Sequence, residues 1–250
     1  MATNIIKRCF GGIGEINPCV EGNEEFLRLI QTESNRFREI LATLADIGAR
    51  IWQRGWAEAN AGNVSINVTD TIPPRLRGGK EWFLVSQSGS RYRQLTPDPI
   101  PHLVLISIGS DGENVHPTNK KPTSEWACHR GLLLHFLASA REDKVILHAH
   151  PADIIALSQM PVYETEAELN RALIGVLPEM QLYLTDGIAL THTQAPGSQA
   201  LADCSLSALG KRKALIWQKH GILCIGKTLD EAFDYLEIVA KAAAIYLKMR

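Results

Sequence analysis

The sequence predicts a mixed α/β fold in which a large, mainly antiparallel sheet is flanked by helices. Helical periodicity marks the early part of the chain and its C-terminal end, whereas short apolar runs separated by glycine, proline and polar residues fill much of the rest. With 250 residues, of which 45% are hydrophobic, the chain can form one large core and does not require two. We therefore expect a single domain over residues 1–250, with residues 1–22 as an N-terminal arm without a clear pattern.

The first expected element is a helical segment from Glu24 to Arg54, with at most one break. Its apolar residues recur at steps of three and four, as one buried helical stripe requires: Phe37, Ile40, Leu41, Leu44, Ile47 and Ile51. Three strands should follow at residues 64–68, 82–85 and 103–108, in sequential antiparallel order. A loop rich in proline and glycine separates the first strand from the second.

A second helix should begin near Ser124 and continue past Leu134, and a strand should follow at residues 144–147. Further short apolar runs occur at residues 181–184, 188–190, 214–217 and 222–225, so the sheet should have about eight or nine strands. The chain should end in a helix that begins at Thr228, which forms a capping-box pair with Glu231.

The amino-acid composition indicates which class of partner the protein binds and in which compartment it works. The net charge of −1 and the absence of a Lys/Arg block argue against a nucleic-acid or anionic-lipid surface and favour small molecules. The five cysteines are an odd number without CxxC spacing, as expected for reduced thiols: Cys9, Cys19, Cys128, Cys204 and Cys224. No apolar run is long enough for a signal peptide or a membrane span, so we expect a cytoplasmic protein.

Two histidines stand where the predicted strand at residues 144–147 ends. His148 and His150 are two residues apart, so on a strand their side chains share a face. A strand end that meets solvent is one interpretation, and a shared metal ion is the other. His220, which precedes Gly221 at another strand end, would complete a set of three imidazoles, a common ligand set for a catalytic Zn²⁺ that keeps one position open. The remaining histidines are interpreted as surface or packing residues: His102, His116, His129, His135 and His192.

Glu125 stands at the predicted start of a helix, directly after Thr123 and Ser124. Capping of the helix explains such a group, because hydroxyls and acids are common in first turns. The hydroxyls and free amides would equally suit an anion, beside a carboxylate that moves protons.

Two turns offer further polar groups. Asn60, Gly62 and Asn63 enter one strand, and Ser86, Ser88, Gly89 and Ser90 leave another. Ordinary turn chemistry accounts for both, but exposed amides and hydroxyls could also hold a phosphate group. No Walker motif is present.

These motifs in this order, N-x-G-N, S-G-S-x-Y-R, T-S-E, H-x-H and K-H-G, resemble the class II aldolase family of zinc-dependent sugar-phosphate aldolases. The resemblance runs from about Trp52 to Met249 and implies a three-layer αβα fold. Within the family, the chain most resembles the branch that cleaves L-rhamnulose 1-phosphate to dihydroxyacetone phosphate and L-lactaldehyde.

The resemblance also implies the roles of individual residues. His148, His150 and His220 would bind Zn²⁺, and Glu125 would be the acid/base. Phosphate would be surrounded by Asn60, Gly62, Asn63, Ser88, Gly89, Thr123 and Ser124. Glu179, ahead of a short strand, would act across a subunit boundary in a homotetramer.

Other activities remain open at this point. The fold is shared with fuculose-phosphate aldolases, ribulose-phosphate 4-epimerases and a thio-sugar dehydratase. It is also shared with the head domain of adducin, a binding module that lacks the metal histidines. The presence of all three histidines here speaks against a binding module.

Overall fold

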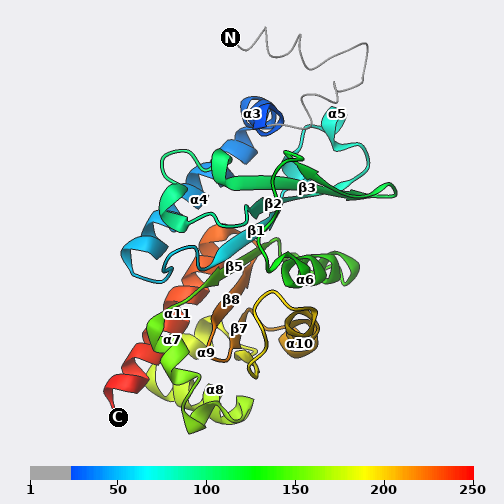
Figure 1. Ribbon diagram of the computed structural model, residues 1–250. Helices are drawn as coiled ribbons and strands as arrows, with labels where there is room; N and C mark the ends of the chain where they lie inside the picture. The colour runs from blue at the N-terminus through cyan, green and yellow to red at the C-terminus, as the bar shows by residue number, and fades with distance from the viewer. Residues whose placement is uncertain (1–23) are drawn as a thin grey trace. The chain divides into compact units, whose positions relative to one another are not determined.

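The computed structural model describes residues 24–250 (Figure 1). The expected N-terminal arm over residues 1–22, with Cys9 and Cys19, therefore lies outside the described residues. The chain forms two compact units. The first contains residues 24–49 and 65–123, and the second contains residues 50–64 and 124–250.

The helical segment at the start of the first unit has one break, within the limit of at most one that the sequence analysis set. Helix α3 (Glu24–Glu33) ends one residue before Ser34, and α4 (Asn35–Gln53) begins directly after it. The Ser34 hydroxyl accepts a hydrogen bond from the Phe37 N–H at 3.2 Å, which is the contact of an N-cap residue. A new helix start at Ser34 therefore explains the break.

Four strands follow in sequential antiparallel order: β1 (Asn63–Asn67), β2 (Glu81–Ser86), β3 (Leu103–Gly109) and β4 (Gly112–His116). Short helical turns lie between them: η1 (Thr69–Thr71), α5 (Pro74–Arg77), η2 (Tyr92–Gln94) and η3 (Ile100–His102). The three expected strands are confirmed. The sequence did not predict β4, because that strand is largely polar and only His116 at its end is buried.

The second unit contains most of the remaining elements: α6 (Trp126–Ala138), β5 (Val145–Ala149), α7 (Ala152–Leu157), η4 (Pro161–Tyr163), α8 (Glu166–Val176), α9 (Glu179–Tyr183), β6 (Ala189–Thr191), α10 (Gln199–Leu209), β7 (Ala214–Trp217), β8 (Gly221–Gly226) and α11 (Leu229–Lys248). Its strands follow the order β5-β8-β7-β6. Only the β6–β7 pair among them is parallel. The mainly antiparallel pairing is therefore confirmed.

The second unit has three layers. On one side of its strands, α11 packs against β5 and β8 and is itself contacted by α7, α8 and α9. On the other side, α6 and α10 pack against each other and against the strands (Figure 1). Strands β5, β7 and β8 are buried throughout because helices cover both faces. This is the αβα arrangement that was expected.

The prediction of a strand at residues 181–184 is wrong, because this segment belongs to helix α9. Pro178 precedes the helix and Met180 is buried, whereas Leu182 and Tyr183 are 72% and 55% exposed. An apolar run that is half exposed does not supply the buried face of a strand in the sheet interior.

Helices α8 and α10 were not predicted, although both carry capping signals. Thr165 accepts a hydrogen bond from the Glu168 N–H at 3.2 Å, and Ser198 accepts one from the Leu201 N–H at 3.1 Å. A search for Ser or Thr at helix starts would have found both helices.

The C-terminal helix begins as expected. The Thr228 hydroxyl accepts a hydrogen bond from the Glu231 N–H at 3.1 Å, and the Glu231 carboxylate accepts one from the Lys227 N–H at 2.5 Å. Among the residues from 24 onward, no helix combines the length and apolar character that crossing a bilayer requires.

Candidate active site

His148 is the fourth residue of β5, where it is fully buried. Its Nδ1 lies 2.9 Å from the carbonyl oxygen of Ile222 on the neighbouring strand β8. Because a carbonyl oxygen only accepts, Nδ1 carries the proton and Nε2 keeps its lone pair. Burial lowers the pKa of His148 to about 3, with Glu125 opposing and the two neighbouring histidines adding to the effect. The ring is therefore neutral, as a metal ligand must be.

His150 follows directly after β5 and is half-buried. Its N–H donates to the Trp56 carbonyl oxygen at 2.8 Å, and its Nδ1 lies 3.0 Å from an Oε1 of Glu58. The carboxylate accepts from Nδ1, so the Nε2 of His150 also presents a lone pair when the ring is neutral. The interpretation of this strand end as a solvated one does not fit His148, which water cannot reach.

His220 reaches the same place from the turn between β7 and β8. Gly221 follows it, and a Cβ atom at this position would lie 2.5 Å from the Ala149 carbonyl oxygen and 2.8 Å from Cδ2 of His150. No side chain fits there without displacing the backbone of β5. Glycine therefore allows β8 to begin directly beside His148 of β5 and His150, which follows that strand.

The three imidazoles form one cluster, in which the ligand atoms all lie within 4.8 Å of one another. The Nε2 atoms of His148 and His150 are 3.0 Å apart. Since the Nδ1 protons of both rings are engaged elsewhere, two lone pairs point at one another, an arrangement that a shared cation stabilises. The donor set of three imidazoles therefore fits a divalent metal ion such as Zn²⁺.

Glu125 is the N-cap residue of α6, but its side chain makes no capping hydrogen bond. The carboxylate instead lies 3.1 Å from Nε2 of His220 and 3.5 Å from Nε2 of His148, and it accepts a hydrogen bond from Asn63 at 2.7 Å. Burial opposes ionisation, but His148 and the hydrogen bonds from His220 and Asn63 hold the pKa of Glu125 below its ordinary value. An ionised, buried carboxylate beside a cluster of histidines can move protons.

Some of the residues that were predicted to bind phosphate lie in or next to the loop over residues 54–62. Asn60 is exposed, Gly62 is half-buried with a φ of +73°, and Asn63 is buried against Glu125. Ser124 is exposed, and Gly197 approaches its carbonyl oxygen so closely that a Cβ would lie 2.8 Å away. The structure thus brings Asn63 to the carboxylate through its side-chain amide.

The other residues that were predicted to bind phosphate belong to the first unit. The Ser88 N–H donates to the Lys121 carbonyl oxygen at 2.9 Å, and the Thr123 N–H donates to that of Ser86 at 2.8 Å. Ser88 and Gly89 therefore lie on an exposed turn beside the segment that ends at Thr123. Because the histidines belong to the second unit, a joint site with these three residues stays a prediction.

Glu179 is exposed and is the first residue of α9, rather than a residue ahead of a strand. It lines a hollow of about 590 Å³ in the second unit, together with Arg54, Trp56, Asp153, Leu177, Glu237, Ile238, Ala240, Lys241 and Ala244. Its action across a subunit boundary stays a prediction.

The histidines and cysteines that were assigned to packing or to the surface lie in the core or at the surface. His116 and His129 are buried, His102 is half-buried, and His135 and His192 are exposed. The described cysteines are free thiols: Cys128, Cys204 and Cys224. Burial raises the pKa of Cys128 to about 12, so this thiol is unreactive.

The sequence analysis did not identify two residues that contact the cluster. Glu58 orients His150 through its carboxylate, and Trp217 packs its ring against His148 and His220. Glu58 lies two residues before the motif that begins at Asn60, but nothing local indicated which histidine it would contact. Trp217 lies only three residues before His220, a spacing that places it in the same hairpin.

Comparison with known proteins identifies the family. The family model "Class II Aldolase and Adducin N-terminal domain" matches residues 42–247. A rhamnulose-1-phosphate aldolase from Pectobacterium carotovorum is 30% identical over 224 residues, which cover 80% of this chain and 81% of that protein. One from Listeria welshimeri is 28% identical over 228 residues, or 82% of each chain.

Solved structures agree with these relatives. A sugar-phosphate aldolase from Thermotoga maritima aligns with a TM-score of 0.75 and 27% identity, over 86% of this chain and 96% of that one. An L-fuculose-1-phosphate aldolase from Thermus thermophilus aligns with a TM-score of 0.60 and 21% identity, over 85% and 96%, which shows a shared fold. The chain therefore belongs to the class II aldolase and adducin N-terminal domain family, in which it is an enzyme, a lyase of the aldolase type.

Proposed function

We propose that this enzyme is a Zn²⁺-dependent aldolase that reversibly cleaves L-rhamnulose 1-phosphate to dihydroxyacetone phosphate and L-lactaldehyde. The observation that carries the proposal is the convergence of three imidazoles beside the buried carboxylate of Glu125. The relatives named as rhamnulose-1-phosphate aldolases support this choice of substrate.

His148, His150 and His220 would hold one Zn²⁺ per subunit. When bound, the ion would polarise the carbonyl group of the ketose and stabilise the negative charge that develops on its oxygen. Three protein ligands leave a position for substrate oxygens. The carbonyl of Ile222 and the carboxylate of Glu58, which contact Nδ1 of His148 and of His150, would keep these two rings in place for binding an ion.

Glu125 would be the acid/base at the reacting carbon. When the C3–C4 bond breaks, the C4 hydroxyl would lose its proton as C4 becomes the aldehyde carbon, and the electron pair of the bond would stay with C3. Glu125, whose ionised carboxylate can take up the proton that is released, would then pass a proton to C3. In the synthetic direction, the carboxylate of Glu125 removes that proton from dihydroxyacetone phosphate. The Asn63 amide, which donates to this carboxylate at 2.7 Å, would hold it in place.

The phosphate of the substrate would be bound by amides and hydroxyls from two turns and from the segment before α6: Asn60, Gly62, Asn63, Ser88, Gly89, Thr123 and Ser124. Glu179 would act on the neighbouring subunit's site in a homotetramer. We further propose that residues 1–250 form one class II aldolase domain that works in the cytoplasm, in rhamnose degradation. The single continuous family match supports the one-domain proposal.

Metal dependence is tested by removing and restoring the ion. Chelation should abolish cleavage, and added Zn²⁺ or Co²⁺ should restore it, whereas borohydride with substrate should leave the enzyme active because no lysine Schiff base forms. Full cleavage activity in a metal-free preparation would contradict the proposed mechanism.

Substrate choice is tested with a panel of four sugar phosphates: L-rhamnulose 1-phosphate, L-fuculose 1-phosphate, L-ribulose 5-phosphate and a methylthioribulose phosphate. The highest kcat/KM should belong to L-rhamnulose 1-phosphate. A higher value for another member would replace the substrate with that sugar, and epimerisation or dehydration without cleavage would replace the reaction.

The shared site is tested by subunit mixing. Glu179→Ala and His220→Ala proteins should each be inactive as homotetramers, and activity should return when their subunits exchange. Demonstrated exchange without recovered activity would place Glu179 outside the active site.

A further inference from the structure

His220 is the histidine of the cluster whose orientation hydrogen bonds explain least. The Nδ1 atoms of His148 and His150 have partners at 2.9 and 3.0 Å, a carbonyl oxygen and a carboxylate. The Nδ1 of His220 is buried and has no hydrogen-bond partner within the described part of the chain. Metal-binding histidines usually owe their orientation to a partner at the second ring nitrogen. Within the described residues, the ring of His220 is therefore held by a hydrogen bond at one nitrogen only, through the 3.1 Å contact of its Nε2 with Glu125, and a further support is needed.

The indole of Trp217 occupies the required position. Its ring stacks on that of His220, with centroids 5.0 Å apart and planes inclined by 25°. The same indole lies 4.8 Å from the ring of His148, inclined by 51°. Trp217 is only 1% exposed, so two of the three imidazoles rest against one buried aromatic surface.

The indole is itself fixed from the opposite side. Its Nε1–H donates to the hydroxyl oxygen of Ser205 at 2.8 Å, and that hydroxyl donates to the Leu201 carbonyl oxygen at 2.6 Å. Since the single hydroxyl proton goes to the carbonyl, the oxygen of Ser205 is free to accept from the indole. Ser205 is fully buried on α10, so the contact holds the indole in one plane.

The turn between β7 and β8 explains why such support is needed. The chain passes from Trp217 to His220 through Lys219, which has a φ of +61° and whose N–H donates to the Ser158 hydroxyl at 2.9 Å. These contacts fix the backbone of the turn, but none of them restrains the torsion angles of the His220 side chain. The stack on Trp217 supplies that restraint.

We propose that Trp217, anchored by Ser205, is a positioning residue that holds His220, and through its second ring contact His148, in the orientation required for metal binding. The inference rests on the proposed function, because it needs the three histidines to bind a metal ion. Trp217 touches the ligand residues and acts through them.

The experiment compares metal binding in three variants of the full chain. Trp217→Leu removes the stack, Trp217→Phe keeps an aromatic ring without the anchor, and Ser205→Ala keeps the indole without its acceptor. Zn²⁺ affinity is measured by competition with a chromophoric chelator, and the geometry of the site by the visible absorption of the Co²⁺-loaded protein.

Trp217→Leu should weaken Zn²⁺ binding by about 10–100-fold and change the Co²⁺ spectrum, as expected when the support of a ligand is lost. Trp217→Phe should recover part of the affinity. The Zn²⁺ affinity of Ser205→Ala should lie between that of Trp217→Phe and that of the parent. Its Co²⁺ spectrum should shift in the same direction as that of Trp217→Leu.

Trp82 provides the matched control. It is 2% exposed, and its Nε1–H donates to the Arg77 carbonyl oxygen at 2.9 Å, but its ring neighbours are Phe26 and His116. Trp82→Phe should lower the melting temperature in the way a core substitution does and leave Zn²⁺ affinity and the Co²⁺ spectrum unchanged.

Each outcome separates the inference from the function it rests on. If the parent protein binds Zn²⁺ and all three variants bind it equally with the parent spectrum, Trp217 only fills the core and the inference is wrong. A Trp217→Leu protein that does not fold leaves Trp217→Phe and Ser205→Ala to decide. If the parent itself binds neither ion, the proposed function is overturned first.

Discussion

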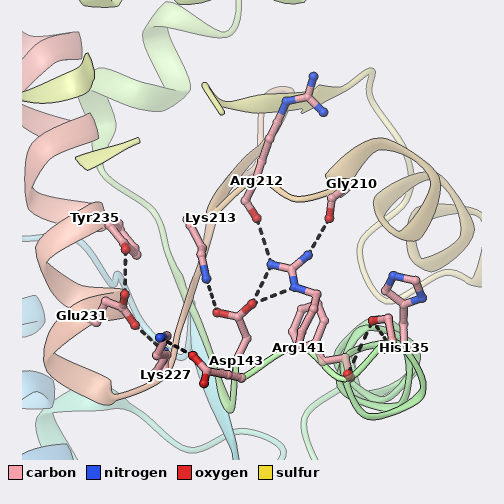
Figure 2. A network of polar contacts seen from close by, with 12 residues as sticks. His135, Arg141, Asp143, Gly210, Arg212, Lys213, Lys227, Glu231 and Tyr235 are labelled. Carbon is pink, nitrogen blue, oxygen red and sulfur yellow. Dashed lines mark hydrogen bonds and ion pairs between the residues drawn. The ribbon is translucent and has the colours of Figure 1, made fainter. Parts of the chain in front are cut away.

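Two buried carboxylates, those of Asp143 and Glu125, lie near opposite ends of strand β5, and the charged groups around them differ. Before the strand, Asp143 pairs with Lys213 and accepts a hydrogen bond from the Nε of Arg141 at 2.7 Å (Figure 2). At the other end, the carboxylate of Glu125 lies against the imidazole rings of His148 and His220 and accepts a hydrogen bond from the Asn63 amide. One carboxylate is neutralised by permanent cations, and the other is surrounded by groups that can exchange protons or bind a metal.

The cations around Asp143 also have further partners. Arg141 donates to the carbonyl oxygen of Gly210 at 2.5 Å and to that of Arg212 at 3.4 Å, so one network joins β5 to the turn before β7 (Figure 2). Within the second unit, Glu125 instead contacts His148, His220 and the amide of Asn63. A buried acid that is paired with permanent cations stabilises the fold, whereas one that lies among imidazoles is available for chemistry.

The largest effect should follow from Glu125→Gln. Removing a general acid/base costs about 10²–10⁴-fold in rate, while the amide keeps the size of the side chain and much of its hydrogen bonding. The variant should fold and bind Zn²⁺, yet fail both to cleave the sugar phosphate and to exchange the proton of dihydroxyacetone phosphate with solvent. Cleavage is followed by a coupled assay and exchange by NMR. Exchange at the parent rate would assign the proton transfer to another group.

Asp143→Asn should have the opposite signature. Breaking a buried ion pair costs about 3 kcal/mol or somewhat more in free energy of unfolding, because Arg141 and Lys213 lose their common anion. The kcat of the folded protein should not change. Denaturation by urea measures the loss, and Glu142→Gln is the control, since Glu142 pairs with Lys227 at the surface and should contribute little. A large fall in kcat would couple the network to the active site.

Gly221→Ala should damage the cluster by a smaller amount. The new Cβ would meet the Ala149 carbonyl oxygen and the rings of His148 and His150, so the ligands must move. We expect Zn²⁺ affinity to fall by about 10–100-fold, which chelator competition would detect.

The matched glycine is Gly131 in α6, where a Cβ would have no neighbour within 4 Å. Gly131→Ala should bind Zn²⁺ like the parent and gain about 0.5–1 kcal/mol in stability. Unchanged affinity in Gly221→Ala would mean that β5 and β8 separate without cost.

The smallest expected effect concerns His129, a buried histidine on α6 outside the cluster. Burial lowers its pKa to about 4, which the Glu125 carboxylate partly opposes. The unfolded chain therefore binds a proton below about pH 6.5 that the folded chain does not take up until about pH 4. Stability is fully present above the higher value and falls as the pH drops between the two, by about 2 kcal/mol at about pH 5.

The measurement compares urea denaturation of the parent, His129→Leu and His135→Leu between about pH 7.5 and about pH 5. His129→Leu should show a shallower loss of stability with acid. His135 is an exposed histidine of the same helix, so its variant should keep the parent slope. Equal slopes in all three proteins would mean that His129 is accessible to protons in the folded state.

The positions of the elements were predicted well where a local pattern existed. The helical segment at the start, the strands that follow and the start of the last helix at Thr228 were each marked by periodicity or by a capping residue, whereas the position of the break at Ser34 was not predicted. The prediction was wrong at residues 181–184, because an apolar run does not reveal whether its side chains are buried. There, tertiary packing leaves Leu182 and Tyr183 exposed on a helix.

The sequence by itself determined the family, and it singled out the three histidines that cluster in the structure and the acid at the start of α6, since short motifs in a particular order carry that information. Only the tertiary structure decided that the Glu125 carboxylate faces the histidines instead of capping its helix, and that Glu58 and Trp217 contact the rings of the cluster. Glu58 and His150 are 92 residues apart in the chain. Contacts of this kind depend on the packing of distant segments, which local propensity does not encode.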